Sequence, residues 1–228
     1  MASQVSEIQR MSRLRRFLAP QLAELIVDSG DESFLESHRR EIVVVFCDLR
    51  GFTTFAEASE PEEVMGVLEE FHAALGDLIF RFEGTLERFT GDGLMVFFND
   101  PVRCDDGPAR AIRMSVAMRT RVRGLAEAWA RQGHDLALGI GIAQGFATLG
   151  RIGFEGRHDY AAVGSVTNLA SRLCGVAEPW QILVTERVFS TAGPLAVGED
   201  AGTRELRGFS RSVHVFDVKG IDNARVES

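Results

Sequence analysis

The sequence predicts an α/β fold of the α+β type, with long helices packed on one β-sheet. Apolar residues recur at three- and four-residue steps in two long segments, as in helices that bury one face. Short β-branched runs flank these segments, so the expected order is strand, helix, strand, strand, helix, strand. The chain has 228 residues, of which 45% are hydrophobic, which suits one domain with a short appendage.

The first 40 residues differ from the rest and predict a separate N-terminal helical segment. Apolar residues recur at helical spacing between Ile8 and Leu18 among several arginines, and Pro20 then ends this helix or begins a second one. The arginines either form a solvated face or belong to a helix that pairs with its own copy and connects to an upstream domain. Residues 28–40 are polar and charged, so we place the boundary at residue 40, with one folded domain over 41–228.

The sequence of the first part of the folded domain predicts one strand and one long helix. The apolar, β-branched run Ile42–Asp48 is typical of a buried strand. Pro61 stands in front of two glutamates, as at the start of a helix, and apolar residues keep helical spacing over 61–83. Gly84 is the expected C′ glycine that ends this helix.

A hairpin and a second long helix follow. Thr85–Thr90 and Leu94–Phe98 have the composition of strands and are joined at Gly91-Asp92-Gly93, which is typical of a hairpin turn. Pro108 begins the second helix and Gly133 ends it.

The sequence of the remainder of the domain predicts several short strands and one further helix. The expected strands are Leu136–Ala143, Ala147–Ile152 as its candidate partner, Tyr160–Val163, and two near 181–184 and 213–218, with a helix over about Ser165–Val176. The complete order is that of a split βαβ arrangement, a ferredoxin-like βαββαβ core. That fold serves many functions, so function must be inferred from particular residues.

Composition argues against several classes of function. The formal net charge is −8, whereas nucleic-acid-binding surfaces are basic, so we expect no nucleic-acid partner. No stretch approaches the roughly 20 apolar residues of a membrane-spanning helix, and no signal peptide is apparent, so we expect no membrane span within this chain. The three cysteines, Cys47, Cys104 and Cys174, are isolated, as expected for reduced thiols in a cytoplasmic protein.

An acidic residue ends the first predicted strand, within the motif Phe46–Thr53. Asp48 precedes a glycine turn at Gly51, which places a carboxylate beside free backbone N–H groups. Such N–H groups bind phosphate, while a carboxylate binds a divalent cation. Most strand-end aspartates only cap a turn, so this motif alone does not establish a metal site.

The hairpin turn carries a second acidic residue, Asp92. A Gly-Asp-Gly turn is favourable for structural reasons alone. In this topology, however, the turn places Asp92 at the sheet edge beside the strand that ends in Asp48. Two such carboxylates suit a site for two Mg²⁺ ions.

A third motif, Gly164–Arg172, lies at the start of the last predicted helix. Asn168 and Arg172 are four residues apart and therefore share a helix face. An amide beside a permanent cation can orient a ribose and stabilise charge on a phosphoryl group. An ordinary solvated helix face has the same composition, so this pair is not diagnostic alone.

The three motifs in this order, F-x-D-x-x-G-F-T, G-D-G-x-M and G-x-x-x-N-x-A-S-R, strongly resemble those of the class III adenylyl and guanylyl cyclase family. The resemblance runs from about Glu41 to Val218, and Arg13–Leu25 is similar to the helical element that precedes bacterial domains of this family. It implies a cyclase that converts ATP to 3′,5′-cyclic AMP and pyrophosphate with two divalent cations, Mg²⁺ or Mn²⁺. It also implies a homodimer whose two sites each combine residues of both subunits, with an upstream sensor acting through the N-terminal helices.

The resemblance assigns a role to residues of every motif. Asp48 and Asp92 match the metal-binding aspartates, and the Leu49 carbonyl is a further candidate ligand. Asn168 matches the ribose-orienting residue and Arg172 the transition-state arginine. The phosphate-binding positions are Gly51, Phe52, Thr53 and, in a looser alignment, Arg207.

The two purine-specifying positions depart from the adenylyl cyclase pattern. A Lys and an Asp read adenine in that pattern, whereas this sequence has Arg88 and Ala161. Ala161 cannot accept a hydrogen bond from the adenine amino group, and a guanidinium is not equivalent to an ammonium. The guanine-specific pattern is also absent, and Glu87, next to Arg88, should point to the opposite face of its strand. We expect ATP to be preferred over GTP, with modest selectivity.

Other functions are consistent with part of these observations. A guanylyl or mixed-specificity cyclase, and an inactive cyclase-like domain that dimerises or senses nucleotides, would contain the same residues. A diguanylate cyclase would require a G-G-[DE]-E-F signature, which is absent. An RNA-binding ferredoxin-like module would be less acidic and would carry aromatic residues on its strands.

Overall fold

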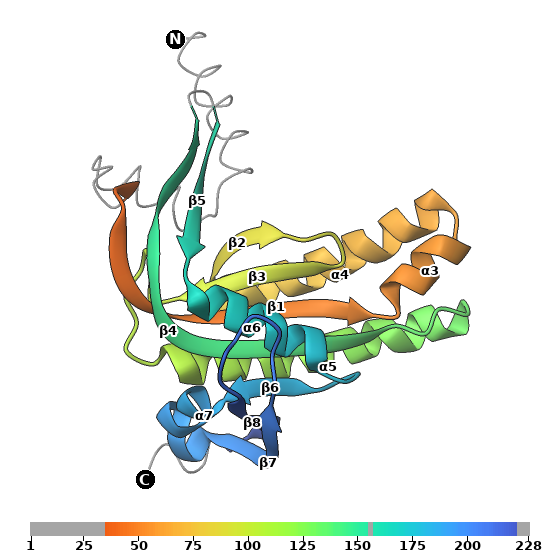
Figure 1. Ribbon diagram of the computed structural model, residues 1–228. Helices are drawn as coiled ribbons and strands as arrows, with labels where there is room; N and C mark the ends of the chain where they lie inside the picture. The colour runs from red at the N-terminus through yellow and green to blue at the C-terminus, as the bar shows by residue number, and fades with distance from the viewer. Residues whose placement is uncertain (1–34, 155–156, 223–228) are drawn as a thin grey trace, which may run out of the picture.

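A computed structural model describes residues 35–154 and 157–222 (Figure 1). Most of the predicted N-terminal helical segment, residues 1–34, lies outside the described residues. The helices of the described part are α3 (Phe52–Ala58), α4 (Pro61–Arg81), α5 (Gly107–Arg131), α6 (Ser165–Val176), α7 (Glu186–Ala192) and the short 3-10 helix η3 (Gly193–Leu195). The strands are β1 (His38–Arg50), β2 (Thr85–Phe89), β3 (Gly93–Phe98), β4 (Ala137–Phe154), β5 (Arg157–Val163), β6 (Ile182–Thr185), β7 (Ala196–Arg204) and β8 (Val213–Ile221).

Among the helices of residues 35–154 and 157–222, we find no segment with the length and apolar character that a membrane-spanning helix requires.

The strands of the described chain form one eight-stranded sheet around β1. Its order is β2-β3-β1-β4-β6-β8-β7, and β5 pairs with β4. β1 pairs antiparallel with β3 over Val43–Asp48 and with β4 along its whole length. The elements β1, α4, β2, β3, α5 and β4 therefore form the expected ferredoxin-like βαββαβ core.

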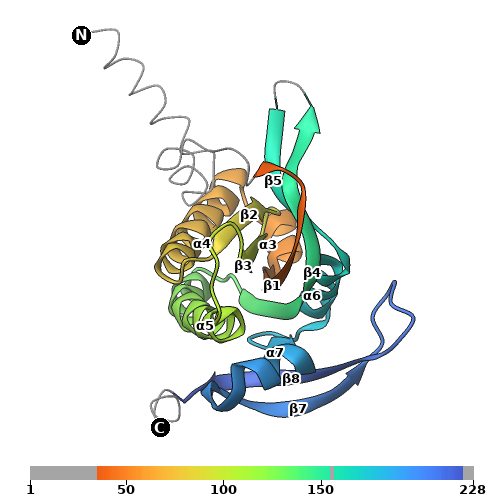
Figure 2. The same ribbon diagram turned by 90° about the vertical axis from the view of Figure 1, so that its left-hand side faces the viewer.

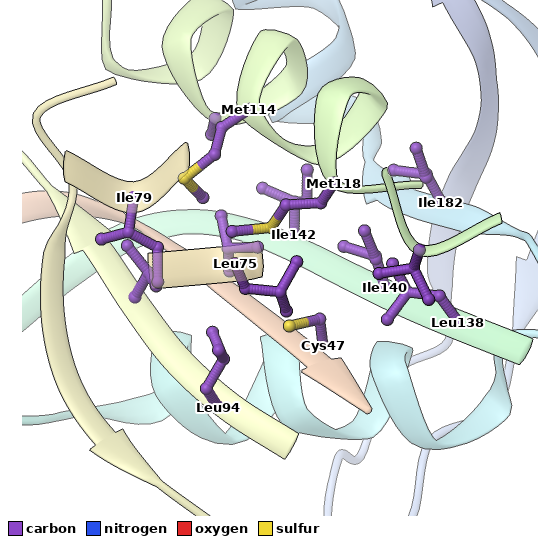
Figure 3. Packing of buried hydrophobic residues seen from close by; sticks show 14 of the residues in the cluster. Cys47, Leu75, Ile79, Leu94, Met114, Met118, Leu138, Ile140, Ile142 and Ile182 are labelled. Carbon is purple, nitrogen blue, oxygen red and sulfur yellow. The ribbon is translucent and has the colours of Figure 1, made fainter. Parts of the chain in front are cut away.

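The two long helices, α4 and α5, cover one face of the sheet and enclose the main hydrophobic core (Figure 2). Alternate residues of β1, from Val43 to Leu49, face these helices because side chains alternate between the two faces of a strand. The core around Cys47 in Figure 3 combines residues of both helices and four strands: Leu75, Ile79, Leu94, Met114, Met118, Leu138, Ile140, Ile142 and Ile182. Burial of this apolar surface supplies the main driving force for folding.

The opposite face of the sheet carries α6, which packs directly on β4 (Figure 2). Gly139, Gly141 and Gly145 occupy alternate positions of β4 and present no side chain to this helix. A Cβ at residue 141 would lie 2.1 Å from the backbone nitrogen of Cys174 and 2.4 Å from the carbonyl oxygen of Ala170. The close approach of α6 to the sheet therefore requires glycine at position 141.

β4 is longer than expected and forms part of a projecting arm. We expected Leu136–Ala143 and Ala147–Ile152 to be separate strands that pair, and this prediction was wrong. Both belong to the 18-residue strand Ala137–Phe154, whose second half pairs with β1 and with β5. Together β4 and β5 extend from the body as a ribbon (Figure 1). A glycine such as Gly145 often interrupts a strand. Here a glycine occupies the position because Val166 of α6 packs against it.

The end of α4 differs from the prediction that Gly84 is the C′ residue. Glu83 instead adopts the left-handed conformation, with φ 57, and its N–H donates to the carbonyl of Phe80. The N–H of Gly84 donates to the carbonyl of Ile79 at 2.9 Å, which completes a Schellman motif. Gly84 is needed for a different reason, because a Cβ there would lie 2.7 Å from Cγ1 of Val96.

The elements α3, α7 and β7 were not predicted. β7 contains Gly198, Gly202 and acidic residues, which have low strand propensity. It is a strand because it pairs with β8 at the edge of the sheet, a long-range contact that local composition does not reveal.

Candidate active site

The Asp48 side chain projects from β1 on the face of the sheet that carries α6. Val44 packs on this face, and Asp48 continues the same alternation. The register partners of Asp48 are Gly93 on β3 and Gly139 on β4. A Cβ on Gly93 would lie 2.9 Å from Oδ1 of Asp48, so a glycine on the neighbouring strand leaves room for the carboxylate.

Asp92 lies in the loop between β2 and β3, beside the end of β1. The N–H of Leu49 donates to the Asp92 carbonyl at 3.0 Å and ties the loop to β1. His72 of α4 holds the other side of the loop, with its Nε2 atom 3.1 Å from the carbonyl oxygen of Gly91. The His72 ring also packs on Phe89, with the ring centroids 4.4 Å apart. These contacts position Asp92 from both the sheet and the helix layer.

The two carboxylates are close enough to perturb each other. Burial, reinforced by the charge of Asp92 and by direct contact with its carboxyl group, raises the pKa of Asp48 from an ordinary 3.8 to about 6, while Arg50 opposes the shift. A divalent cation would relieve the repulsion between two such oxygen donors. The described ranges contain no group of three or more His, Cys, Asp or Glu side chains arranged around a metal position. A cation here would therefore also need backbone, water or phosphate oxygens, and the Leu49 carbonyl is the backbone candidate named from the sequence.

Arg50, for which the sequence suggested no role, connects Asp48 to the C-terminal end of α6. Its Nη1 donates to Oδ2 of Asp48 at 3.1 Å, its Nε to the carbonyl of Ala177 at 2.9 Å, and its Nη2 to the carbonyl of Cys174. The guanidinium lies over Gly139, where a Cβ would come within 2.5 Å of Nη2. The last carbonyls of a helix favour a cation, so this end of α6 is a suitable anchor for Arg50.

The predicted phosphate-binding residues lie where β1 passes into α3. We expected only a glycine turn, but Gly51 is the N-cap of a short helix and Phe52 and Thr53 begin it. Backbone N–H groups in the first turn of a helix have no acceptor within that helix, so they can bind an anion. Gly51 has a positive φ of 83, and a Cβ there would lie 2.6 Å from the carbonyl oxygen of Asp135. Both constraints require glycine.

Asn168 and Arg172 project from the outer face of α6. The helix buries residues such as Val166 and Leu173 against the sheet, whereas both candidate residues are exposed. Within 35–154 and 157–222, neither side chain has a hydrogen bond or an ion pair. The structure therefore does not join this pair to the Asp48 carboxylate within one chain.

Arg207 lies on the loop between β7 and β8, next to α6. Leu206 and Phe209, on either side of it, belong to an apolar cluster with Leu173 and Ala177 of that helix. The Arg207 side chain itself is exposed. The structure therefore places Arg207 beside the helix that carries the third motif.

Glu87 and Arg88 lie on the same face of β2, so the prediction that they face opposite ways was wrong. The pairing of β2 with β3 shifts between Leu86 and Arg88, and Glu87 is the extra residue of a β-bulge. Arg88 lies opposite Met95, whose side chain is buried on the α6 face of the sheet. Nε and Nη2 of Arg88 both donate to the Glu87 carboxylate, the second at 2.9 Å.

Ala161 lies on β5, close to this ion pair. It is opposite Gly150 on β4, and the adjacent Ala162 packs into the core on the α6 face. Burial raises the pKa of the Glu87 carboxyl, and hydrogen bonds from Arg88 and from the backbone N–H of Ala162 offset only part of this rise. The structure thus brings the two predicted purine-specifying segments together, with Glu87 between them.

Comparison with known proteins gives consistent matches over nearly the whole described region. The model of the family described as the adenylate and guanylate cyclase catalytic domain matches residues 35–217. The crystal structure of the adenylyl cyclase CyaB from P. aeruginosa is 33% identical, with a TM-score of 0.80, and the alignment covers 83% of this chain and 98% of that chain. The crystal structure of the guanylyl cyclase Cya2 is 32% identical, with a TM-score of 0.79, over 82% of this chain and 95% of that chain.

Longer adenylate cyclases also match. Adenylate cyclase 1 of Rhizobium meliloti is 26% identical over 211 residues, which are 91% of this chain and 32% of that protein. The chain spans less than half the length of the curated adenylate cyclases that it matches.

Proposed function

This chain belongs to the family of adenylate and guanylate cyclase catalytic domains, and we propose that it converts ATP into 3′,5′-cyclic AMP and pyrophosphate. The observation that carries the proposal is the pair of mutually repelling carboxylates, Asp48 and Asp92, beside the backbone N–H groups that begin α3. The adenylyl cyclase CyaB, at 33% identity over nearly its whole chain, supports the choice of ATP.

We assign two divalent cations, Mg²⁺ or Mn²⁺, to the two carboxylates. Oxygen donors suit such cations, and the Leu49 carbonyl is proposed as a further ligand. When bound, the cations would lower the pKa of the ribose 3′-hydroxyl and neutralise charge on the triphosphate. Burial is the largest cause of the raised pKa of Asp48, and the negative charge of Asp92, which a cation would offset, adds to it and supports this assignment.

The remaining proposed site residues position the substrate. In the reaction the 3′-hydroxyl attacks the α-phosphorus and pyrophosphate leaves, so the protein mainly aligns groups and balances charge. Backbone N–H groups of Gly51, Phe52 and Thr53 would hold the β- and γ-phosphates. Asn168 would orient the ribose, Arg172 would stabilise charge on the transferring phosphoryl group, and Arg207 would contact the triphosphate.

We further propose that each site forms between two copies of the chain, arranged head to tail. In a single chain Asn168 and Arg172 are exposed and have no partner among the described residues. A second copy that presents this helix face to Asp48 and Asp92 would complete the site. Both sets occur in one sequence, so a homodimer would contain two equivalent sites.

Residues 1–40 are proposed to transmit a signal to the catalytic domain from an upstream sensor. The similar adenylate cyclases are more than twice as long as the region that matches this chain, which supports the existence of further domains in such proteins.

We place the protein in the cytoplasm, where its nucleotide substrate is available.

The alternative to an ATP-specific enzyme is a guanylyl or mixed-specificity cyclase. Ala161 offers no side-chain acceptor for the amino group of adenine. The guanylyl cyclase Cya2 matches the chain almost as well as CyaB does, with 32% identity. This alternative concerns only the base, because the carboxylates and phosphate-binding groups serve either nucleotide.

The proposal is tested by incubating the purified protein with ATP or GTP and Mg²⁺ or Mn²⁺. Products are identified by mass spectrometry, and Asp48→Ala protein is the control for contaminating cyclases. We expect cyclic AMP and pyrophosphate that require both the metal and Asp48. If neither nucleotide yields a cyclic product, the chain is an inactive dimerising or nucleotide-sensing domain instead.

A further inference from the structure

A cavity between α5, β8 and the loop that follows α6 has the properties of a second ligand site. Its volume is about 420 Å³, which is within the range of small-molecule sites. Of the described residues that line it, none belongs to the proposed active site. We propose that this cavity binds a small molecule that carries a phosphate group, with Arg123 and Lys219 as the charged contacts.

The loop of residues 178–181 forms a preorganised wall of the cavity. The N–H of Gln181 donates to the carbonyl of Glu178 at 3.0 Å, and the N–H of Trp180 donates to the carbonyl of Leu138 at 2.7 Å. Trp180 has a positive φ of 68, a conformation that large side chains rarely adopt. Its indole packs against the main core, which holds the loop in this conformation. Strained positions of this kind are concentrated at binding and active sites.

Arg119 of α5 fixes this loop to β8 from below. The residue is buried, and its guanidinium donates to the carbonyl of Val218 at 2.8 Å, to that of Trp180 at 3.4 Å and to that of Lys219. One buried cation thus holds backbone carbonyls of two segments, so the base of the cavity is rigid.

Arg123, one turn further along α5, is the cation that remains available to a ligand. It is exposed and lies over the Trp180 ring, with Cζ 5.4 Å from the ring centroid. Within the part of the chain that the structure describes, it has no hydrogen bond or ion pair. Burial lowers the pKa of Arg119, and the like charge of Arg123 lowers it further, although Asp217 opposes the shift. An anion bound beside Arg123 would offset this repulsion.

Lys219 contributes a second accessible cation from β8. Its ammonium lies 2.6 Å from Oδ2 of the buried Asp217 and 3.4 Å from a carboxylate oxygen of Glu199. An ammonium has three donors, so a further donor is available to a ligand. Of the described residues that line the cavity, three are basic and two are acidic, on a chain whose net charge is −8. This local excess of positive charge favours an anionic ligand.

Phosphate suits these donors because its oxygens accept hydrogen bonds from a guanidinium fork and an ammonium at the same time. The phosphate could be free, as in pyrophosphate, or attached to a nucleoside. A cavity of this volume is larger than inorganic phosphate requires, which favours a phosphate attached to a larger group.

The loop is also connected to the Asp48 carboxylate. It follows directly after Ala177, whose carbonyl accepts from Nε of Arg50 at 2.9 Å, and Arg50 donates to Asp48. A ligand that shifts the loop would therefore act on a contact of the proposed active site and change the cyclase rate. This consequence rests on the proposed function, whereas binding itself does not.

Binding is measured by tryptophan fluorescence and by isothermal titration calorimetry, in EDTA and at an ionic strength held constant with KCl. The chain has two tryptophans, and Trp129 is buried in the core. A change in emission that disappears in Trp180→Phe therefore reports the cavity. The probes are inorganic phosphate, pyrophosphate and AMP, with acetate as a carboxylate for comparison.

The test variants are Arg123→Gln and Lys219→Gln, and the matched control is Arg121→Gln, an exposed change on the same helix. We expect saturable binding of at least one phosphate probe, and binding of acetate that is about tenfold weaker. Each test variant should weaken binding about tenfold, because it removes a charge-assisted hydrogen bond. Arg121→Gln should change the affinity by less than about twofold. Tighter binding of AMP than of pyrophosphate would identify a nucleotide, and the reverse would identify free phosphate.

Absence of binding by all three phosphate probes would overturn the inference, as would a fluorescence change that KCl alone reproduces. Binding that both test variants leave unchanged would arise elsewhere, for example at the first turn of α3, and would also overturn it. Circular dichroism establishes that each variant folds, and if Lys219→Gln does not, Arg123→Gln decides.

The regulatory consequence is tested in the cyclase assay. We expect the best-bound phosphate probe to change kcat by about twofold or more in wild type and in Arg121→Gln, but not in Arg123→Gln. An equal effect in all three proteins would refute regulation through this cavity. If no nucleotide yields a cyclic product, the proposed function is refuted, whereas the fluorescence result still decides whether the cavity binds phosphate.

Discussion

At the scale of single residues, Asp48 combines a functional position with a cost to stability. Its pKa is raised to about 6 by burial and by the neighbouring Asp92. The folded state therefore holds a proton that the unfolded state has already lost between about pH 4 and pH 6. The contribution of Asp48 to the stability of the metal-free protein should fall as the pH rises through this window, since a raised carboxyl pKa disfavours the ionised folded form.

Asp48→Asn should therefore stabilise the metal-free protein while abolishing cyclase activity. We expect its melting temperature in EDTA to exceed that of the wild type by about 2–4 °C above pH 6, a modest value because the carboxylate is partly exposed to solvent. The difference should disappear below about pH 4, where both proteins are neutral at this position. Asp77→Asn, an exposed change on α4, serves as the control. A lower melting temperature at pH 8 would contradict the prediction.

Arg50 is the residue that links the carboxylate strand to α6, and Arg50→Lys tests this link. A Lys ammonium keeps the charge but cannot hold the three acceptors that the planar fork reaches, on Asp48, Cys174 and Ala177. We expect kcat to fall about tenfold with less than a twofold change in KM, and the free energy of unfolding to fall by about 1–3 kcal/mol.

The measurements for Arg50→Lys are steady-state kinetics and urea unfolding, with Arg121→Lys on the exposed side of α5 as the control. Loss of stability with unchanged kcat would mean that Arg50 only supports the fold. That outcome would remove Arg50 from the proposed active site.

At the scale of elements, the position of α6 depends on the small residues of β4. Gly141 has backbone atoms of α6 within the space that a Cβ would occupy. Because α6 carries Asn168 and Arg172, a shift of this helix would move both residues relative to the sheet. The alternating glycines in the sequence of β4 are the signal that could have revealed this packing in advance.

Gly141→Ala should destabilise the protein strongly and reduce activity. The new methyl group meets helix backbone rather than a movable side-chain end, so we expect a loss of about 2–3 kcal/mol in urea unfolding. Gly124→Ala in α5 is the matched control, because no atom lies within 4 Å of the added Cβ. Alanine is the better helix former, so this control should gain about 0.5–1 kcal/mol. Equal effects of the two changes would refute the packing argument.

At the scale of the whole molecule, one chain presents two incomplete sets of proposed site residues. Asp48 and Asp92 lie together at the end of β1, while Asn168, Arg172 and Arg207 are associated with α6 and its adjoining loop. Arg50 connects the two sets within a chain through the far end of α6. In a head-to-tail dimer, the same contact would link one active site to the other.

A mixing experiment tests the shared site. Asp48→Ala and Asn168→Ala proteins should each be nearly inactive, because each homodimer has both sites impaired. Random exchange makes half of the dimers mixed, and each mixed dimer regains one intact site, so activity should recover to about one quarter of the wild-type value. Native mass spectrometry measures the exchange. A mixture that exchanges but stays inactive would exclude the composite site.

The elements predicted most accurately from the sequence are those whose pattern is local and repeated. α4, α5 and α6 lie where apolar periodicity placed them, and the β2–β3 hairpin turns at its Gly-Asp-Gly segment. Strand β7 was missed because its stability comes from pairing with β8 rather than from its own composition. The long β4 was divided for a similar reason, since glycines that usually interrupt a strand here make room for α6.

The family resemblance, the core topology and the identity of the candidate site residues could be inferred from the amino-acid sequence, because motif spacing and periodicity are properties of the chain alone. Which of these residues contact one another depends on the tertiary structure. Arg50 reaches carbonyls 124 and 127 residues away, and a bulge turns Glu87 and Arg88 to one face. Such contacts depend on strand register and on helix approach, which are set by packing between distant segments rather than by local sequence.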